Sequence, residues 1–459
     1  MKAVDLDLLK KYDVPGPRYT SYPPAPVFTT SFDAKAYQRE NIRNNPPDST
    51  EVLSLYLHIP FCATLCYFCG RTTIVTPNRQ QIAEYLEYLK REIDLVVRSM
   101  AHRRKVVQIH LGGGTLSCLN PEEIEDLMLF LQEQFRFAPV MEAEIEIDPR
   151  GLTFDHLLAM RLAGFNRISM GVQDFDPRIQ AAVNRIQPEE LTRRVFAWSR
   201  ALDFTSINVD LIYGLPLQSI ESARTTIEKI IEMSPHRIAL FNFAYVPWMK
   251  PHQKLLHPED LPSAEVKVGI LKTAIEKLTS AGYFYIGMDL FAKRGDELVA
   301  AQANKTLQRN FQGYSIKAGS DLYAFGMSAI SHFKNIYAQN YKTLEDYFGA
   351  IDAGQPPTAV GYRMTRDDEI RKYLIMRLMC DLEVSKADVE ARFDIYFDEY
   401  FDPELEQLNA LGRDGLVVHN VSIIRVTPTG RLFLRNIAMC FDATLKQHVK
   451  ENPIFSRTV

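Results

Sequence analysis

The sequence has no strong excess of charge of either sign and no long hydrophobic run. Its 459 residues carry a formal net charge of -4, so we expect no bulk attraction to nucleic acid or to a membrane surface. No stretch approaches the roughly 18 apolar residues that a membrane-spanning helix needs. Residues 1–7 contain no apolar segment, so we expect no signal peptide. These absences predict a cytoplasmic protein.

Cysteine is also scarce, since the chain has six, too few for a disulfide framework at this length, which indicates a reducing compartment. Three of them, Cys62, Cys66 and Cys69, follow an apolar stretch with the spacing C-x3-C-x2-C. Thiolates at such spacing are typical ligands of a four-iron four-sulfur cluster. No fourth cysteine lies nearby, which would leave one iron open to a substrate or cofactor. The alternatives are structural or free cysteines, or a zinc site, which would need a second half-site that is not visible.

The composition is otherwise ordinary for a soluble globular protein, with 46% hydrophobic and 24% charged residues. From residue 52 to about 250, strand-like runs alternate with helix-like segments such as 80–98 and 121–135. This alternation predicts an α/β fold, an incomplete parallel (β/α)6 TIM-like barrel with an N-terminal arm and a mainly helical C-terminal domain. The six expected strands are 52–60, 106–111, 143–147, 168–172, 207–212 and 238–243.

Three regions are expected along the chain. An arm over 1–50 is rich in proline and glycine, and either packs as an ordered loop or covers a pocket mouth. A catalytic domain over 51–340 contains the partial barrel to about 250 and an extension, with a helix at 262–281, a strand at 283–291 and an irregular region at 308–331. A mainly helical C-terminal domain over 341–459 has a small hairpin at 415–430.

The C-terminal helices and hairpin are typical of a winged-helix module, which often binds DNA. Phosphate binding needs clustered lysine and arginine, whereas the stretch 394–406 is acidic. The sequence therefore favours a structural or lid role, with no nucleic acid as partner.

Polar residues follow the expected strands at their carboxyl ends, where sites on such folds lie. The glycines of Gly112-Gly113-Gly114-Thr115 would allow close backbone approach to a ligand, or form a plain turn. Glu144 and Glu146 share one strand face, inside the barrel or at a solvent-facing edge. A carboxylate such as Asp210 among apolar neighbours needs a partner, either structural or a ligand.

The cysteine loop YLHIPFCATLCYFCG resembles that of the radical S-adenosylmethionine superfamily. Nearly the whole chain resembles one branch of it, the oxygen-independent coproporphyrinogen III oxidases. The resemblance rests on the segments GPRYTSYP, GGGT, IEIDP, GFNRISMGVQDF, NVDLIYGLP, RNFQGY, GMSAIS and MCFD.

The resemblance implies site residues. Cys62, Cys66 and Cys69 would hold one 4Fe-4S cluster, and two molecules of S-adenosylmethionine would bind. Tyr56 and His58 are the candidate catalytic residues, although the role of His58 is open. The molecule bound to the cluster would contact Tyr56, the backbone of Phe68, Gly113, Glu146 and Ile330. The second would contact Gly114, Thr115, Gln173, Arg185, Asp210 and Ala244.

The resemblance implies an oxidoreductase that decarboxylates two propionates of coproporphyrinogen III to vinyl groups through a 5′-deoxyadenosyl radical. Its partners would be the tetrapyrrole substrate, a reducing electron donor and an unknown acceptor, with the chain monomeric. The alternatives are a related enzyme acting on another tetrapyrrole, a haem-binding or haem-trafficking protein that retains the cluster, and a nucleic-acid regulator.

Three positions depart from the family pattern: Arg71, where the family usually has cysteine; Leu116, where it usually has proline; and Leu290, where it often has histidine. Arg71 matters most, because a guanidinium near the pocket suits a substrate with carboxylates but is equally consistent with a different substrate.

Overall fold

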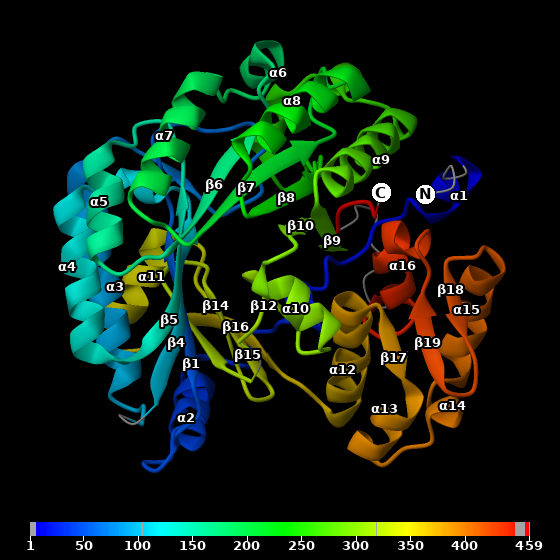
Figure 1. The fold of residues 1–459 in the computed structure, drawn as a ribbon. Coiled ribbons are helices and arrows are strands. Elements are labelled where there is room, and N and C mark those ends of the chain that lie inside the picture. The colour runs from blue at the N-terminus through cyan, green and yellow to red at the C-terminus, as the bar shows by residue number, and fades with distance from the viewer. Residues whose placement is uncertain (1–5, 102–103, 318, 446–454, 459) are drawn as a thin grey trace.

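The computed structural model describes residues 6–101, 104–317, 319–445 and 455–458. Its centre is a 12-stranded sheet in the order β16-β15-β14-β13-β1-β4-β5-β6-β7-β8-β10-β9, shown in Figure 1. The sheet has two free edges, so the barrel is incomplete, as the sequence predicts. Among the described residues, no helix has the length and apolar character to span a membrane.

The six predicted parallel strands are confirmed, and they lie side by side in chain order. Their two-residue period separates two environments, because successive side chains point to opposite faces. In β1, Leu55 and Leu57 are fully buried, whereas Tyr56 and His58 line a cavity. The strands are β1 (Leu53–Ile59), β4 (Lys105–Gly113), β5 (Arg136–Ile147), β6 (Arg167–Gln173), β7 (Ser206–Tyr213) and β8 (Arg237–Asn242).

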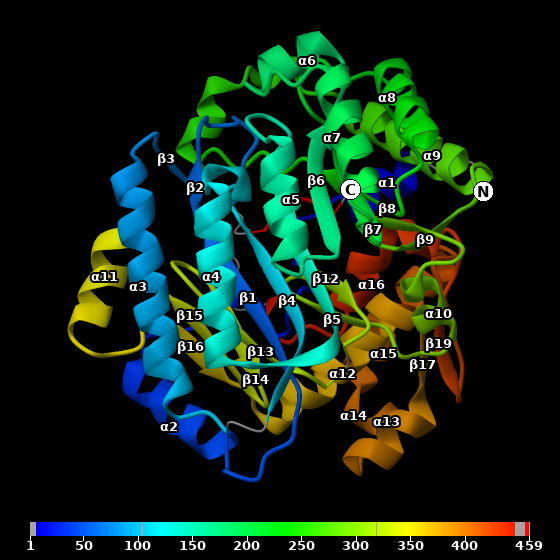
Figure 2. The ribbon, with the colours of Figure 1, turned by 60° about the vertical axis from the view of Figure 1, so that its left-hand side comes forward.

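Helices cover the outer face of these strands (Figure 2). Side-chain caps stabilise the starts of two of them: Asn120 caps α4 in a capping box with Glu123, and Ser219 caps α8. The helices are α3 (Arg79–Val97), α4 (Pro121–Gln134), α5 (Phe154–Leu162), α6 (Pro177–Ala182), α7 (Glu189–Ala201), α8 (Ile220–Met233) and α9 (Ala264–Ser280). Short 3-10 helices lie between them at Leu116–Cys118, Pro251–Leu255 and Pro258–Asp260.

The sheet continues beyond the six strands on both sides. A seventh parallel strand, β13 (Asp321–Phe325), pairs with β1, in a region that the sequence suggested was irregular. The single strand expected at 283–291 is two antiparallel strands, because the backbone turns at Gly287 and Met288, which have positive φ. The added elements are β9 (Tyr283–Gly287), β10 (Leu290–Lys293), α10 (Glu297–Ala303), β11 (Gln308–Asn310), β12 (Gly313–Ser315), β14 (Ile330–Phe333), β15 (Ile336–Asn340) and β16 (Thr358–Arg363).

The sheet ends at Arg363 rather than near residue 340. β16 pairs with β15, and α11 (Leu344–Asp352) contacts α3, so residues 344–363 pack with the barrel. The following helices and a three-stranded sheet have a hydrophobic core of their own. They are α12 (Arg366–Asp381), β17 (Glu383–Ser385), α13 (Lys386–Phe393), α14 (Phe397–Tyr400), α15 (Asp402–Arg413), β18 (Val417–His419), β19 (Ile423–Val426), a 3-10 helix (Gly430–Phe433) and α16 (Leu434–Met439).

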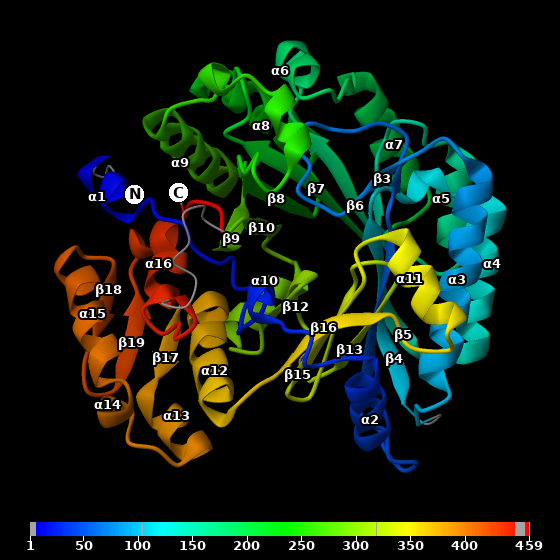
Figure 3. The ribbon, with the colours of Figure 1, turned by 180° about the vertical axis from the view of Figure 1, so that it is seen from behind.

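The N-terminal arm contributes to both cores instead of forming a separate unit. α1 (Leu6–Tyr12) and the buried Tyr19 and Tyr22 belong to the C-terminal core, whereas Tyr37 of α2 (Ala34–Asn44) belongs to the barrel core. A 3-10 helix at Ala25–Val27 lies between them. In Figure 3 the blue arm runs from α1 to α2 between the C-terminal domain and the sheet. The arm therefore connects the two cores.

Candidate functional site

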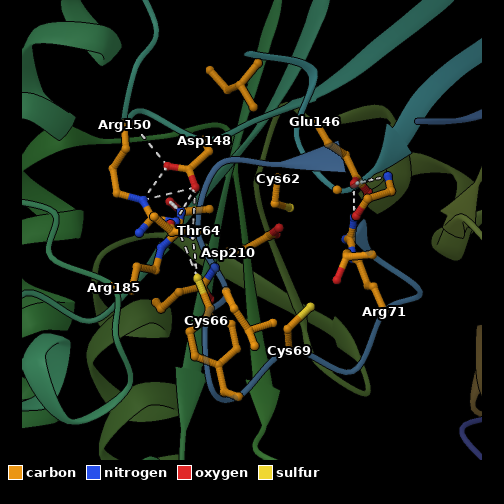
Figure 4. A pocket seen from close by; sticks show the side chains of 18 of the residues that line it. Cys62, Thr64, Cys66, Cys69, Arg71, Glu146, Asp148, Arg150, Arg185 and Asp210 are labelled. Carbon is orange, nitrogen blue, oxygen red and sulfur yellow. Dashed lines mark hydrogen bonds and ion pairs between the residues drawn. The ribbon is translucent and has the colours of Figure 1, made fainter. Parts of the chain in front are cut away.

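The cysteine loop leaves the carboxyl end of β1 and is closed at its base by two short strands, β2 (Phe61–Cys62) and β3 (Ile74–Val75). The three thiols are free, Cys66 being buried and the other two half-buried. All three line a cavity of about 120 Å³ (Figure 4). Burial raises the pKa of the Cys62 thiol to about 12, and the neighbouring thiols of Cys69 and Cys66 add to this. A negative charge on these sulfurs is costly without a counter-charge. A cationic centre in the cavity would supply that charge and bind the sulfurs as thiolates.

The donor set fits a cluster. Within the part of the chain that the structure describes, no three His, Cys, Asp or Glu side chains are placed as ligands of a single metal ion. The thiolates of an iron–sulfur cluster bind different irons, so they need not converge on one point. Three free cysteines around one cavity therefore fit the ligand set that such a group requires.

Two guanidiniums lie against Cys66. Arg150 Nη2 is 3.4 Å and Arg185 Nη1 is 3.6 Å from its Sγ. Both also pair with Asp148, at 2.7 and 2.9 Å. Burial would raise the pKa of Asp148, but the charges of Arg185 and Arg150 outweigh burial and lower it. Two cationic groups therefore lie against the Cys66 sulfur, on the side of the small cavity that Asp148 also lines. Arg185 was among the predicted site residues, whereas Asp148 and Arg150 were not, although both lie within three residues of the end of β5.

His110, also missed, lies between two carboxylates. Its Nδ1 is 3.4 Å from Glu144 Oε2 and its Nε2 is 3.3 Å from Glu146 Oε1. Burial would lower the pKa of His110, but the hydrogen bonds to Glu144 and Glu146 raise it to about 10. The imidazole is therefore charged at neutral pH. Strand register is the feature that places His110 in the site, because Tyr56, His110 and Glu144 are opposite one another on β1, β4 and β5.

The glycines after β4 make room for the site's own residues. A Cβ on Gly112 would lie 2.9 Å from the carboxyl of Glu146, and one on Gly114 would lie 2.2 Å from the carbonyl oxygen of Phe61. Gly113 has φ +121°, a conformation that side chains disfavour. The triplet is therefore no plain turn, because the cysteine loop passes directly over it.

Arg71 and Glu146 form an ion pair at the opposite side of the small cavity from the Asp148 group (Figure 4). Arg71 Nη2 donates to Glu146 Oε1 over 3.0 Å, and Arg71 Nη1 donates to the carbonyl oxygen of Gly113 over 3.1 Å. Burial would raise the pKa of Glu146, but the Arg71 guanidinium and His110 hold it well below its usual range. Glu146 is thus a firmly ionised carboxylate at the centre of the site.

A larger cavity of about 610 Å³ adjoins the first and shares Arg71, Glu146, Ser169 and Asp210 with it. Arg18 and Thr20 bring the arm into its wall, so the arm does border a pocket. Three side-chain atoms of its lining are buried and have no hydrogen-bond partner among the described residues: Arg309 Nε, Gln312 Oε1 and Asn208 Oδ1. Buried polar atoms are normally satisfied, so these atoms are available to a ligand.

The predicted site residues divide between the two cavities. Those lining the small cavity are Cys62, Cys66, Cys69, Phe68, Gly113, Gly114, Glu146, Gln173, Arg185 and Asp210. Those lining the large one are Tyr56, His58, Glu146, Asp210 and Ile330. Thr115 and Ala244 line neither: Thr115 caps the helix Leu116–Cys118, and the carbonyl of Ala244 accepts from Gln253. Of the departures, Leu116 is buried and Leu290 lines the large cavity.

Comparison with known proteins gives consistent matches. Residues 56–230 match the radical SAM superfamily and residues 364–433 match the HemN C-terminal domain. A Synechocystis sp. protein named oxygen-independent coproporphyrinogen III oxidase is 44% identical over 99% of this chain and 97% of its own length. The Escherichia coli protein of that name is 43% identical over 99% and 98%. A solved structure of coproporphyrinogen III oxidase (HemN) from Escherichia coli, a radical SAM enzyme, has a TM-score of 0.91 at 42% identity and covers 96% of this chain and 99% of that one.

Proposed function

Because the chain belongs to the oxygen-independent coproporphyrinogen III oxidase family of the radical SAM superfamily, we propose that it converts coproporphyrinogen III to protoporphyrinogen IX. The reaction is the oxidative decarboxylation of two propionate side chains to vinyl groups. One observation carries the proposal: a cavity lined by three thiols adjoins a larger cavity whose wall contains arginines from separate elements. A radical source thus adjoins a space suited to a multiply carboxylated molecule.

The cysteines would hold one 4Fe-4S cluster, and residues of both cavities would hold S-adenosylmethionine. When bound, these groups supply a 5′-deoxyadenosyl radical, which cleaves a C–H bond that acid–base side chains cannot. The carboxylate of Glu146 suits an ammonium group, and Tyr56, Phe68, Gly113 and Ile330 would complete that site.

A second S-adenosylmethionine is supported by atoms that lack partners. Within the part of the chain that the structure describes, Gln173 Oε1 and Arg185 Nε are buried without a hydrogen bond, although both residues line the small cavity. Asp210 lies between the two cavities, and Asn208 donates to its Oδ1 over 2.7 Å. These three residues offer acceptors and a donor to a polar cofactor, and Gly114 lines the same cavity. Thr115 and Ala244, which belong to the same predicted site, line neither cavity.

The protein's part in the reaction is to bind, orient and exclude water. Held by the residues named above, the cofactor would supply the radical that removes a hydrogen atom from the β-carbon of a propionate. The bond to the carboxylate then breaks, carbon dioxide leaves and one electron passes to an acceptor, which leaves a vinyl group. Arg309 suits a substrate carboxylate, because it lines the larger cavity and has no ion pair among the described residues. Its Cζ lies 4.7 Å from the centroid of the Tyr314 ring.

We also propose that the protein acts in the cytoplasm as a monomer, with an external electron donor and acceptor. The scarcity of cysteine supports a reducing compartment.

The test is an anaerobic assay. The cluster is reconstituted, reductant, S-adenosylmethionine and coproporphyrinogen III are added, and tetrapyrroles and 5′-deoxyadenosine are separated by chromatography. We expect protoporphyrinogen IX with about two cofactor cleavages per product, one for each propionate. Cys66→Ser should abolish both products, whereas Cys440→Ser, at a buried cysteine outside both cavities, should retain them. Cofactor cleavage without a vinyl product would indicate that the substrate is another tetrapyrrole. No cleavage in a preparation with an intact cluster would refute the proposal.

A further inference from the structure

Arg71 lies in the wall between the two cavities and lines both of them. Its side chain is 47% exposed, whereas that of its partner Glu146 is only 19% exposed. The exposed part of the Arg71 side chain therefore faces the two cavities that it lines, while Glu146 holds the tip of its guanidinium. It has room to turn toward the larger cavity.

Glu146 does not depend on Arg71 for its hydrogen bonds. The amide of Gly113 donates to Glu146 Oε2 over 3.2 Å, and Nε2 of the charged His110 is 3.3 Å from Oε1. If Arg71 turned away, the carboxylate would keep both contacts. Breaking a buried ion pair is usually costly because it leaves a buried charge unpaired. This pair can open without that cost, since Glu146 keeps its other two contacts.

Both acceptors of Arg71, the carboxylate of Glu146 and the carbonyl of Gly113, belong to residues that we assign to S-adenosylmethionine. An ammonium group arriving there competes with the guanidinium for the same oxygens. It also places a like charge beside Arg71, and like charges at such short range repel. The cofactor therefore favours the position of Arg71 that faces the larger cavity.

The other arginines of that cavity are not linked to the cofactor site in this way. Arg237 is occupied by Asp296, at 2.8 Å, and by Glu297, at 2.9 Å. Arg18 lies 3.3 Å from Asp289. Arg71 differs from these two arginines, because its carboxylate partner, Glu146, belongs to the proposed S-adenosylmethionine site.

We infer that Arg71 binds a carboxylate of the tetrapyrrole and does so when S-adenosylmethionine takes over Glu146. The guanidinium exchanges one carboxylate for another, which preserves its bidentate pairing. The inference rests on the proposed function and adds to it a coupling between cofactor and substrate. Because coupling between two sites is reciprocal, each ligand should tighten the other by the same factor, typically about 5- to 150-fold.

Binding of coproporphyrin III, a fluorescent molecule with the same four propionates, tests the inference. Its dissociation constant is measured with the reconstituted protein, without reductant, in the presence and absence of S-adenosylmethionine. We expect the wild type to bind the porphyrin at least about fivefold more tightly with the cofactor. In Arg71→Gln this ratio should fall to about one, and Arg71→Lys, which keeps the charge but loses the planar fork, should retain part of it.

Arg309→Gln is the matched control, because Arg309 lines the larger cavity but not the smaller one. It should weaken porphyrin binding equally with and without the cofactor and leave the ratio unchanged. The tetramethyl ester of the porphyrin, which lacks carboxylates, should show no ratio above one in any variant.

The inference would be overturned if S-adenosylmethionine tightened porphyrin binding in both Arg71 variants by the same factor as in the wild type, at equal iron content. The wild-type enzyme would still form its vinyl product in that case, so the proposed function would survive. Absence of the vinyl product in the wild type is the separate failure that would refute the proposed function.

Discussion

The hydroxyl of Tyr56 lies 3.1 Å from Nδ1 of His58, and Nε2 of the same ring lies 3.0 Å from the carbonyl oxygen of Thr72. A carbonyl can only accept, so Nε2 carries the proton and Nδ1 accepts from Tyr56. Burial lowers the pKa of His58 to about 4, which keeps the ring neutral. His58 thus ties the end of β1 to the far side of the cysteine loop.

His58→Phe should loosen the cysteine loop, because the Thr72 carbonyl loses its donor at a cost of about 1–3 kcal/mol. We expect a lower iron content after reconstitution, measured per chain. His58→Gln can still donate to Thr72 and should retain more iron. Equal iron content in both variants would contradict this role.

The depressed pKa of His58 also predicts a pH dependence of stability. Below its ordinary pKa of about 6.5 the unfolded chain takes up a proton that the folded chain refuses. The contribution of this group to the free energy of unfolding is therefore lost as pH falls from about 6.5 toward 4. Denaturant titrations should show that loss in the wild type, and a smaller one in His58→Gln.

Gly114→Ala should disrupt the site, because its Cβ would lie 2.2 Å from the carbonyl oxygen of Phe61. Overpacking against backbone should cost about 3 kcal/mol and displace the cysteine loop. Gly70→Ala is the control from the loop itself, since nothing lies within 4 Å of that Cβ. Thermal unfolding and iron content should change in the first variant alone, and a similar loss in both would refute the steric explanation.

Asp210 should give cofactor binding a pH dependence near neutrality. Burial, followed by the charge of Glu146, raises the pKa of Asp210 to about 6. As pH falls through 6 the carboxylate gains a proton, so S-adenosylmethionine should bind more weakly. His58 stays neutral and His110 stays charged across this range. Equilibrium dialysis from pH 5 to 8 should show the slope in the wild type and a flat profile in Asp210→Asn; parallel profiles would exclude Asp210.

Arg435 fastens the N-terminal arm to the end of the chain. Its buried guanidinium donates to the carbonyl oxygens of Gly16, Pro17 and Ser456. Arg435→Met would remove the guanidinium donor from the carbonyls of Gly16 and Pro17, while the Ser456 carbonyl would keep the amide of Gly16, at 3.0 Å. The loss should cost about 2–4 kcal/mol and expose the arm to protease. Arg178→Met, at a side chain that is 76% exposed, should change stability by less than about 0.5 kcal/mol. Unchanged cleavage of the arm in Arg435→Met would contradict this.

The structure explains why part of the site was predictable. The three cysteines lie within eight residues and the strands alternate with helices, so both signals are local. Arg150, in contrast, reaches Cys66 across 84 positions, and Arg71 reaches Glu146 across 75. Such contacts depend on strand order, which no local pattern encodes. β13 was missed for a related reason, because its partner β1 lies about 270 residues earlier.

The sequence by itself determined three things: the close spacing of the three cysteines, the parallel strands and the family. Each follows from residue types at short spacing, where covalent geometry limits what the chain can do. Only the tertiary structure decided that His110 lies between two carboxylates, that the arm borders the larger cavity and that Arg71 lies between the cavities. Charges and burial depend on neighbours brought together by folding, and the same arginine can bind cofactor-site or substrate carboxylates only where both are within reach.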